Sequence, residues 1–418
     1  MTASATSLRH NRDYVLYRAS RAISALGSQM SGLVYPLLVL SIGGSAVQAG
    51  AAGSCALLTR LACQIPAGHL ADRLDQRRLM IIMDAVRLVS VGSVPLVALL
   101  GHVTYPHLLV VGVVEGAGSA VFGAAAGVYV RVAVPKEQFA RAMSQAQASF
   151  GTTALLGPIL GGALYGVARM LPFVADAASY LISGILLLPV RSHRPSGDND
   201  DAEEPVDWRI TAGMRWLWSH RDIMGMVLFG SALNLVGATM GLAAVVVMHT
   251  HGEPASVIGL VLAVGGCGMV AGSLIARRAV AWGPARVYVA SGLIWAGSLA
   301  SIAVSSSPWV VGAVFAVLSA IGPANGIMLF QILADEAPKS LYGRVSAAQA
   351  LFGSSLSMAG PLLAGVLVVV FGGTYLWLVL GGICLVATIF VVRPTLAYRR
   401  RARDTAATAH LVAAAKGV

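Results

Sequence analysis

Charged side chains are scarce in this sequence. Asp, Glu, Lys and Arg make up only 11% of its 418 residues, whereas 57% are hydrophobic and the mean hydropathy is +0.76. Soluble domains carry about 25% charged residues, so this composition excludes the ordinary soluble classes. We expect the chain to lie in a lipid bilayer.

The motifs of the common nucleotide and metal sites are also missing. The sequence has no Gly-x-x-x-x-Gly-Lys-Ser/Thr phosphate loop and no His-Glu-x-x-His zinc pair. Its four cysteines lie in apolar runs without CxxC spacing, which favours packing over a disulfide or a metal site. His249 and His251 share a short loop, and we interpret them as exposed rather than metal-binding. We therefore expect no cofactor, no metal and no enzyme activity.

Long apolar runs account for most of the chain. A transmembrane helix needs roughly 20 apolar residues. The first run lacks the pattern of a secretory signal, so we expect it to be retained. Twelve runs are long enough, at residues 14–42, 47–70, 79–101, 105–131, 138–163, 170–190, 223–248, 256–276, 286–306, 308–333, 344–371 and 374–393. They predict an all-α membrane protein with twelve transmembrane helices in two six-helix bundles.

Basic residues gather on one side of this twelve-span arrangement. Of the loops on the other side, only one holds a basic residue, Arg169, while Arg60 and Arg87 fall inside spans. This is the positive-inside pattern. It predicts a multi-pass protein of the cell (inner or plasma) membrane with both termini in the cytoplasm. It also explains the net charge of +11 without a nucleic-acid partner.

One long polar segment, residues 191–222, divides the spans six and six. It holds the acidic run 197–204 and, after Pro205, a mixture of aromatic and basic residues. That mixture predicts a short amphipathic helix at the inner interface or a plain connecting helix. We therefore expect an N-terminal six-helix bundle at 1–190, a cytoplasmic linker at 191–222, and a C-terminal six-helix bundle with a basic tail at 223–418.

The two halves repeat each other. Gly157-Pro158 in span five matches Gly360-Pro361 in span eleven, and spans one and four match spans seven and ten in the same way. Parallel duplication of a six-span unit is the architecture in which two bundles rock about a central site.

The most charged short segment joins the second and third spans. Asp72 follows Gly68 by four residues, so on a continuing helix the two share a face, and the glycine would allow a close helix approach. The duplicated half keeps Gly272 and two arginines, but Ala276 stands in the place of Asp72. The full segment is Gly68-His-Leu-Ala-Asp72-Arg73-Leu-Asp75-Gln76-Arg77-Arg78.

This segment resembles the signature loop between the second and third spans of the major facilitator superfamily. The resemblance covers essentially the whole chain through the twelve spans, the long central loop and the repeat. The sequence departs from the family at Asp75, where glycine is usual, and at Gln76, where a basic residue is usual. Together with Asp176 and Arg344, the loop is similar to the siderophore and macrolide (multidrug) exporter branch.

The resemblance implies that the loop acts in gating. Asp72 would dock against the start of span eleven, because a carboxylate is favoured near the positive N-terminal end of a helix. The basic residues would latch the two halves together on the cytoplasmic side. The alternative is that these charges only set the topology. The gating residues would be Gly68, Asp72, Arg73, Arg77 and Arg78.

A glycine-rich stretch in span five is similar to the antiporter motif of proton-coupled exporters in the same superfamily. Glycines let helix backbones approach each other, and proline bends the span. Thr153 stands where the motif has an earlier glycine, so a generic kinked and closely packed helix is the alternative. The matching residues are Gly157, Pro158, Gly161 and Gly162.

Ionisable residues inside the spans, away from their cytoplasmic ends, fall only in the N-terminal half. Such residues are costly in a bilayer and are functional candidates. Asp84 and Arg87 are spaced for a local ion pair, and Arg60 either shares Asp84 or faces a cavity. Glu115 lies near the midplane, where desolvation disfavours the charge and allows proton loading, or else it packs in the core. The candidates for proton coupling are Glu115, Asp84 and Asp176.

These features predict a secondary active exporter of a small amphipathic molecule, such as a drug, an antibiotic or a siderophore-like metabolite. We expect proton antiport by alternating access, with the small molecule, a proton and the bilayer as partners of a monomer. The alternatives are an importer of a small nutrient, by symport or uniport, and a membrane enzyme or receptor, which no nucleophile or metal constellation supports. The predicted cavity residues are Gln29, Arg60, Glu115, Asn234 and Asn325.

Overall fold

The computed structural model describes residues 11–135, 138–192, 210–305, 307–338 and 341–415. Within these ranges the regular structure is helical and contains no strand. Nine of the described helices are long and apolar enough to cross a membrane. The predicted all-α membrane fold is thereby confirmed.

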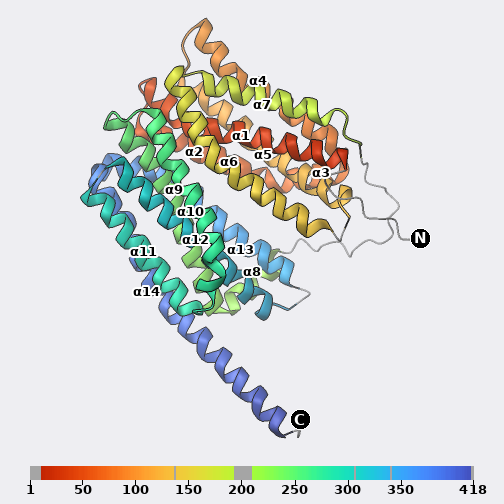
Figure 1. Ribbon diagram of the computed structural model, residues 1–418, viewed down its shortest axis with the longest axis vertical. Coiled ribbons are helices and arrows are strands. Elements are labelled where there is room, and N and C mark those ends of the chain that lie inside the picture. Colours follow the sequence, from red (N-terminus) through yellow and green to blue (C-terminus); the bar gives the residue numbers. More distant parts are fainter. Residues whose placement is uncertain (1–10, 136–137, 193–209, 306, 339–340, 416–418) are drawn as a thin grey trace. The chain divides into compact units, whose positions relative to one another are not determined.

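Seven helices cover the first six predicted spans, and Figure 1 shows their course. The second span consists of two helices that meet at Cys63, and the sixth is a helix of only 17 residues. The helices are α1 (Arg12–Ser41), α2 (Ala46–Ala62), α3 (Gln64–Arg73), α4 (Gln76–Leu100), α5 (Tyr105–Ala133), α6 (Phe139–Val167) and α7 (Leu171–Leu187).

Seven further helices follow α7. The eleventh predicted span is divided between α13 and the start of α14, and α14 continues through the twelfth. Gly372 breaks α14 with a φ of +69°, a conformation that glycine adopts without steric cost. The helices are α8 (Ile210–Ser219), α9 (Arg221–Thr250), α10 (Ala255–Val280), α11 (Pro284–Val304), α12 (Pro308–Glu336), α13 (Tyr342–Ser357) and α14 (Gly360–Ala415).

The described residues form two compact units. The first unit draws on the described residues within 1–202, 241–266 and 361–370, and the second on the described residues within 203–240, 267–360 and 371–418. The linker predicted at 191–222 remains a prediction, because its residues 193–209, with the acidic run, lie outside the described part of the chain.

In the first unit, α1 packs against α6 and α7, and α4 packs between α5 and α7 (Figure 1). At one end an aromatic group fills the core, in which the ring centroids of Tyr17 and Tyr129 are 4.8 Å apart. Nearer the middle, the hydroxyl groups of Ser20 in α1 and Ser183 in α7 share a hydrogen bond of 2.7 Å. Polar side chains therefore enter the α1–α4–α5–α7 core.

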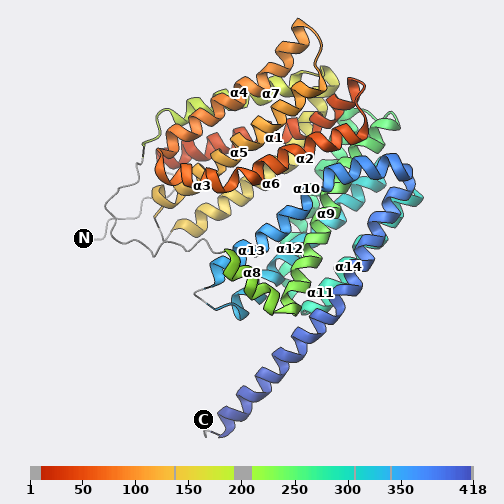
Figure 2. The ribbon, with the colours of Figure 1, turned by 180° about the vertical axis from the view of Figure 1, so that it is seen from behind.

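In the second unit, small residues set two close helix contacts. A Cβ added to Gly268 or Gly272 of α10 would overlap the backbone of Ala316 or Ala320 of α12, which is small-xxx-small packing on both helices. The helix α8 lies in the segment where an amphipathic helix is predicted, and it packs along α13 (Figure 2). In α8, Gly213 approaches the backbone of Arg344 and Val345 in α13, and Leu217 is fully buried.

Candidate functional site

The polar centre of the first unit is a bidentate ion pair between α4 and α5. Arg87 Nε donates to both carboxylate oxygens of Glu115 at 3.1 Å, and Arg87 Nη2 also donates to Oε1. The Arg87 side chain is 5% exposed and that of Glu115 is 25% exposed. A planar guanidinium that meets both carboxylate oxygens gives the strongest class of charged hydrogen bond.

Helix α7 supplies Tyr180 to the same centre. Its hydroxyl group donates to Glu115 Oε1 at 2.9 Å and accepts from Arg87 Nη2 at 2.7 Å. The Arg87 guanidinium also lies 4.1 Å from the centroid of the Tyr180 ring, a cation–π contact. Helix α1 adds Ser28, whose Oγ accepts from Arg87 Nη2 at 2.9 Å. Side chains from three other helices thus hold the guanidinium of α4 in place.

The predicted local pair of Asp84 and Arg87 is present but is the weaker contact of this cation. Arg87 Nη1 lies 3.9 Å from Asp84 Oδ1, at the limit of an ion pair. Ser183 in α7 donates to the other Asp84 oxygen at 2.5 Å. Arg87 therefore has one close carboxylate partner, Glu115, and one more distant partner, Asp84.

Asp176 is the third carboxylate of this core and is 1% exposed. Ser31 of α1 donates to Asp176 Oδ2 at 2.5 Å, and Ser179 lies one turn further along α7. Among the described residues, no ion pair joins Asp176 to a cation. A Cβ on Gly27 of α1 would overlap Ser179 Oγ and approach Asp176 Oδ1 to 2.5 Å, so a larger residue there would require these two side chains to move.

The other predicted cavity residues of the first unit lie away from this centre. Arg60 is exposed near the end of α2 and does not share Asp84. The side chain of Gln29 packs against Gly157, and the backbone at Met30 packs against Gly161, so these two glycines of α6 let it approach α1 closely.

The remaining motif glycine lies on another face of α6. Gly162 approaches the backbone of Ala255 in α10, and the carbonyl group of Pro158 meets Gly259 in the same helix, all within the first unit. The glycine-rich stretch therefore packs α6 against α1 and α10, and Pro158 lies inside α6.

In the second unit, Asn234 and Asn325 line a cavity of about 390 Å³ together with Gln349. Ser291 donates to Asn325 Oδ1 at 3.0 Å and fixes that amide. No charged side chain is among the described residues that line the cavity. The cavity can therefore offer hydrogen bonds to a neutral molecule.

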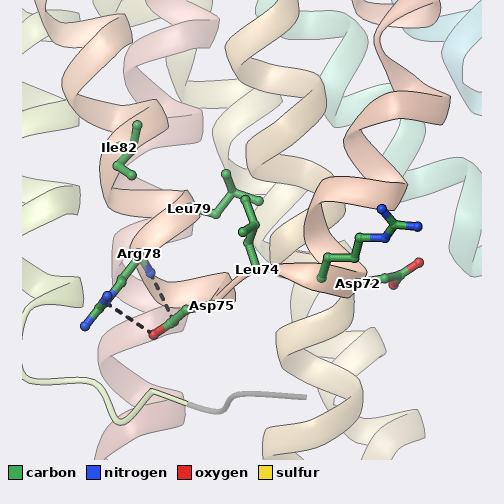
Figure 3. A pocket seen from close by; sticks show the side chains of 7 residues that line it. Asp72, Leu74, Asp75, Arg78, Leu79 and Ile82 are labelled. Carbon is green, nitrogen blue, oxygen red and sulfur yellow. Dashed lines mark hydrogen bonds and ion pairs between the residues drawn. The ribbon is translucent and has the colours of Figure 1, made fainter. Parts of the chain in front are cut away.

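The signature loop divides into two parts (Figure 3). Asp75 caps α4, accepting from the backbone N–H of Arg78 at 3.2 Å, with Arg78 Nε 3.6 Å away. Arg77 donates from Nε to the carbonyl oxygen of Leu187 at 3.0 Å, which places a cation at the C-terminal end of α7. The unusual Asp75 therefore has a local structural role as a helix N-cap.

The other part of the loop faces away from these contacts. Figure 3 shows the Asp72 carboxylate on the opposite side of the loop from the Asp75–Arg78 pair, and both line a surface cavity of about 640 Å³ with Arg73. Within the described residues Asp72 has no hydrogen-bond or ion-pair partner. Its docking on span eleven stays a prediction.

The expectation of a close helix approach at Gly68 is wrong within the described residues. Nothing lies within 4 Å of a Cβ placed there. Helix α3 turns Ala67 and Ala71 toward α5, so Gly68 and Asp72, each one residue further on, face away. Ala276, the counterpart of Asp72, is buried at 1% exposure, and an acid there would lie in the packed core.

Asp75 gives a pH-dependent prediction. Partial burial raises the pKa of its carboxyl group, but hydrogen bonds from Ser192 and from the backbone of Arg78 and Arg77 outweigh burial and hold the pKa below its usual value. The stabilisation is thus present above the unfolded pKa of about 3.9 and is lost as the pH falls through the folded pKa. We expect the melting temperature of the parent to exceed that of Asp75→Asn at pH 7 and the difference to shrink toward pH 3. A difference that does not change with pH would contradict this role.

A family model described as Major Facilitator Superfamily matches residues 19–279 and 224–416. The chain belongs to the major facilitator superfamily. It is a multi-pass membrane transport protein, as the sequence predicts, and not an enzyme.

Two known efflux pumps are similar in sequence to this chain. It is 26% identical over 381 residues to the multidrug efflux pump Tap of Mycobacterium tuberculosis, which covers 87% of this chain and 89% of the pump. It is 28% identical over 201 residues to Tap of Mycolicibacterium fortuitum, which covers 46% of this chain and 49% of that pump. The second match therefore spans about half of each protein.

Solved structures of superfamily type share the fold. A bacterial homolog of the human lysosomal transporter Spinster matches with a TM-score of 0.71 at 13% identity, over 93% of this chain and 96% of the other. The nucleoside transporter NupG matches with a TM-score of 0.68 at 13% identity, over 91% and 99%. At such low identity the likeness shows the fold alone.

The sequence alone identified the acids of this superfamily member but missed how they pair. Glu115 lies 28 residues from Arg87, whereas Asp84 lies three away and suggested the local pair. A signal was available, because Arg87 lies thirteen residues before the end of α4 and Glu115 ten residues after the start of α5. Two antiparallel neighbouring helices joined by a short loop place such residues at similar depth.

Proposed function

We propose that the protein exports a small amphipathic molecule, such as a drug, an antibiotic or a siderophore-like metabolite, in exchange for protons. The observation that carries this proposal is the buried Arg87 centre, in which one guanidinium serves two carboxylates while a third, Asp176, has only hydroxyl partners among the described residues. The similarity to multidrug efflux pumps named Tap supports the outward direction.

The charge balance of the centre supports proton carriage. With all three acids ionised, three negative charges would face a single guanidinium in a low-dielectric core, which is costly. Binding a proton relieves this imbalance. We propose Glu115 as the acid that exchanges the proton with the transport pathway, because its side chain is 25% exposed, whereas the side chain of Asp84 and the residue Asp176 are each only 1% exposed.

Loading Glu115 would also change the partner of Arg87. A neutral Glu115 no longer forms an ion pair, and Arg87 Nη1 is already 3.9 Å from Asp84. The guanidinium can then move toward Asp84, which pulls on α1, α5 and α7 through Ser28, Glu115 and Tyr180. This local change is the element through which a proton would bias alternating access.

The substrate would meet neutral polar groups in the second unit. Asn234, Asn325 and Gln349 line the uncharged cavity of about 390 Å³ there, a size suited to a small ligand. Gln29 and Arg60 of the first unit complete the proposed set of substrate contacts. We further propose that the chain works as a monomer with both termini in the cytoplasm.

Glu115→Gln is the direct test of coupling. Glutamine keeps the size of the side chain and one acceptor oxygen for Arg87 and Tyr180, but it cannot be ionised. In everted vesicles we expect it to lose most of the drug accumulation that an imposed pH gradient drives, by about tenfold or more. Glu253→Gln, in the loop before α10, is the matched control and should behave as the parent. Normal gradient-driven transport by Glu115→Gln removes the coupling role, and uptake only in right-side-out vesicles makes the protein an importer.

Asp72→Asn tests the signature loop. If the carboxylate meets a helix N-terminus during the cycle, its loss should slow transport by between about twofold and thirtyfold, since such contacts contribute roughly 0.3–2 kcal/mol. Ala276→Asp should not restore the rate. Asp335→Asn, which removes an exposed acid of α12, is the control. An unchanged transport rate in Asp72→Asn would reduce the loop to a topology signal.

A further inference from the structure

A second cavity in the first unit combines cationic and apolar walls. It has a volume of about 440 Å³ and lies between α1, α5 and α6, at the end of these helices that the positive-inside pattern places toward the cytoplasm. Neither the transport centre at Arg87 nor the signature loop contributes to its walls. Its size is within the range of small-ligand pockets.

Three arginines form its cationic side. Arg18 and Arg21 are three residues apart on α1 and so share a face, and Arg131 comes from the last turn of α5. No carboxylate is among the described residues that line the cavity. The excess of positive charge is therefore available to an anion that enters it.

One of these arginines is held in position by neighbouring side chains. Gln145 of α6 accepts from Arg18 Nη1 and from the hydroxyl group of Tyr14, each at 3.1 Å. The hydroxyl group of Tyr17 donates to the backbone of Ala126 in α5 at 3.1 Å. These bonds tie α1 to α5 and α6 around the cavity, so this wall is ordered before a ligand arrives.

The opposite wall is apolar. Phe139, Met143 and Phe150 are spaced at four and seven residues along α6, which aligns them on one face, and all three line the cavity. They remain 36%, 47% and 56% exposed. A wall of large apolar side chains beside three arginines suits a ligand that has an apolar body and a negatively charged group.

We propose that this cavity binds molecules with a single anionic head, a carboxylate or a phosphate, joined to an apolar body. The guanidinium groups of Arg18, Arg21 and Arg131 would hold the head and the α6 face would hold the body. That such molecules are then exported rests on the proposed function, whereas their binding does not. Taken together with the proposed function, the inference narrows the substrate class to anionic amphipaths.

The test measures binding of 4-phenylbutyrate to the full chain in nanodiscs of zwitterionic phosphatidylcholine. The parent should bind it more tightly than 4-phenylbutylamine, which has the same body and the opposite charge. The double variant Arg18→Gln with Arg21→Gln should bind 4-phenylbutyrate at least about tenfold more weakly. Arg286→Gln, which removes an exposed arginine at the start of α11, should bind as the parent does. Matching melting temperatures of the variants exclude misfolding.

Equal binding of 4-phenylbutyrate by the parent and the double variant overturns the proposal, as does equal binding of the acid and the amine by the parent. Phosphatidylglycerol added to the nanodiscs distinguishes two sources of the anion. Competition in the parent identifies a lipid headgroup as the occupant, whereas unchanged affinity identifies a solute, and both outcomes support the site. Vesicle flux of 4-phenylbutyrate is measured separately, so loss of the export function cannot be mistaken for loss of binding.

Discussion

Replacing Arg87 with leucine should remove most of the folded protein. The guanidinium is 5% exposed and forms the only ion pairs of Glu115 and Asp84 within the described residues. Leucine would leave both carboxylates in the core with hydroxyl partners alone. Removal of one partner from a buried ion pair costs about 3–5 kcal/mol. The measurement is the melting temperature and the monodisperse fraction of detergent-purified protein.

Two comparisons separate charge from packing. Arg60→Leu removes an exposed arginine of α2 and should leave the melting temperature close to that of the parent. Arg87→Leu combined with Glu115→Leu should recover part of the stability, because the double variant no longer buries the closest unpaired carboxylate. If Arg87→Leu melts like the parent, the centre does not stabilise the fold, and its role in proton coupling loses its structural basis.

The helices could be predicted from the sequence because their signal is local. Twenty apolar residues identify a span whatever its neighbours are, and every predicted span coincides with a helix or a helix pair of the structure. The breaks inside spans were not predicted. The junction of α2 and α3 at Cys63 and the positive φ of Gly372 depend on the backbone path, and an apolar run carries no sign of either.

The sequence predicted the individual charged residues of the candidate site but not which of them contact one another. Arg87, Glu115 and Asp84 stood out because ionisable groups are rare in spans. Their pairing depends on which helices are neighbours, and the Tyr180 and Ser28 partners carried no signal of their own. Polar residues of modest hydropathy are common in such spans. Only their contact with a buried cation marks these two as part of the site.

The internal repeat predicts that the two halves share one arrangement of spans, but it does not predict which glycines make close helix contacts. Gly68 and Gly272 are equivalent in sequence, yet the first has open space around it and the second contacts Ala320 of α12 backbone to backbone. The difference follows from the helix face that each presents to a neighbour. A single sequence records that both glycines are present but not which of them is needed.

Gly272→Leu should therefore destabilise the second unit strongly. Even a Cβ at this position would overlap the Ala320 carbonyl group, and this neighbour is backbone that cannot rotate away. Overpacking in a dense core costs typically about 1–3 kcal/mol and more where backbone must move. Gly268→Leu should act in the same way at Ala316, one turn earlier. The measurement is the melting temperature in detergent. Leucine is favoured over glycine inside a helix, so a lower melting temperature comes from the lost packing and not from helix propensity.

Gly297 provides the matched control for this contact. It lies within α11 of the same unit, and a Cβ there has nothing within 4 Å. Gly297→Leu should leave the melting temperature unchanged or raise it slightly, since leucine is favoured over glycine inside a helix by up to about 1 kcal/mol. An equal fall in melting temperature at Gly272 and Gly297 would mean that any large side chain added to these helices destabilises the protein, and that the α10–α12 contact is not the cause. A loss at Gly272 alone, with Gly68→Leu unaffected, would show that the duplicated halves use the same glycine for different purposes.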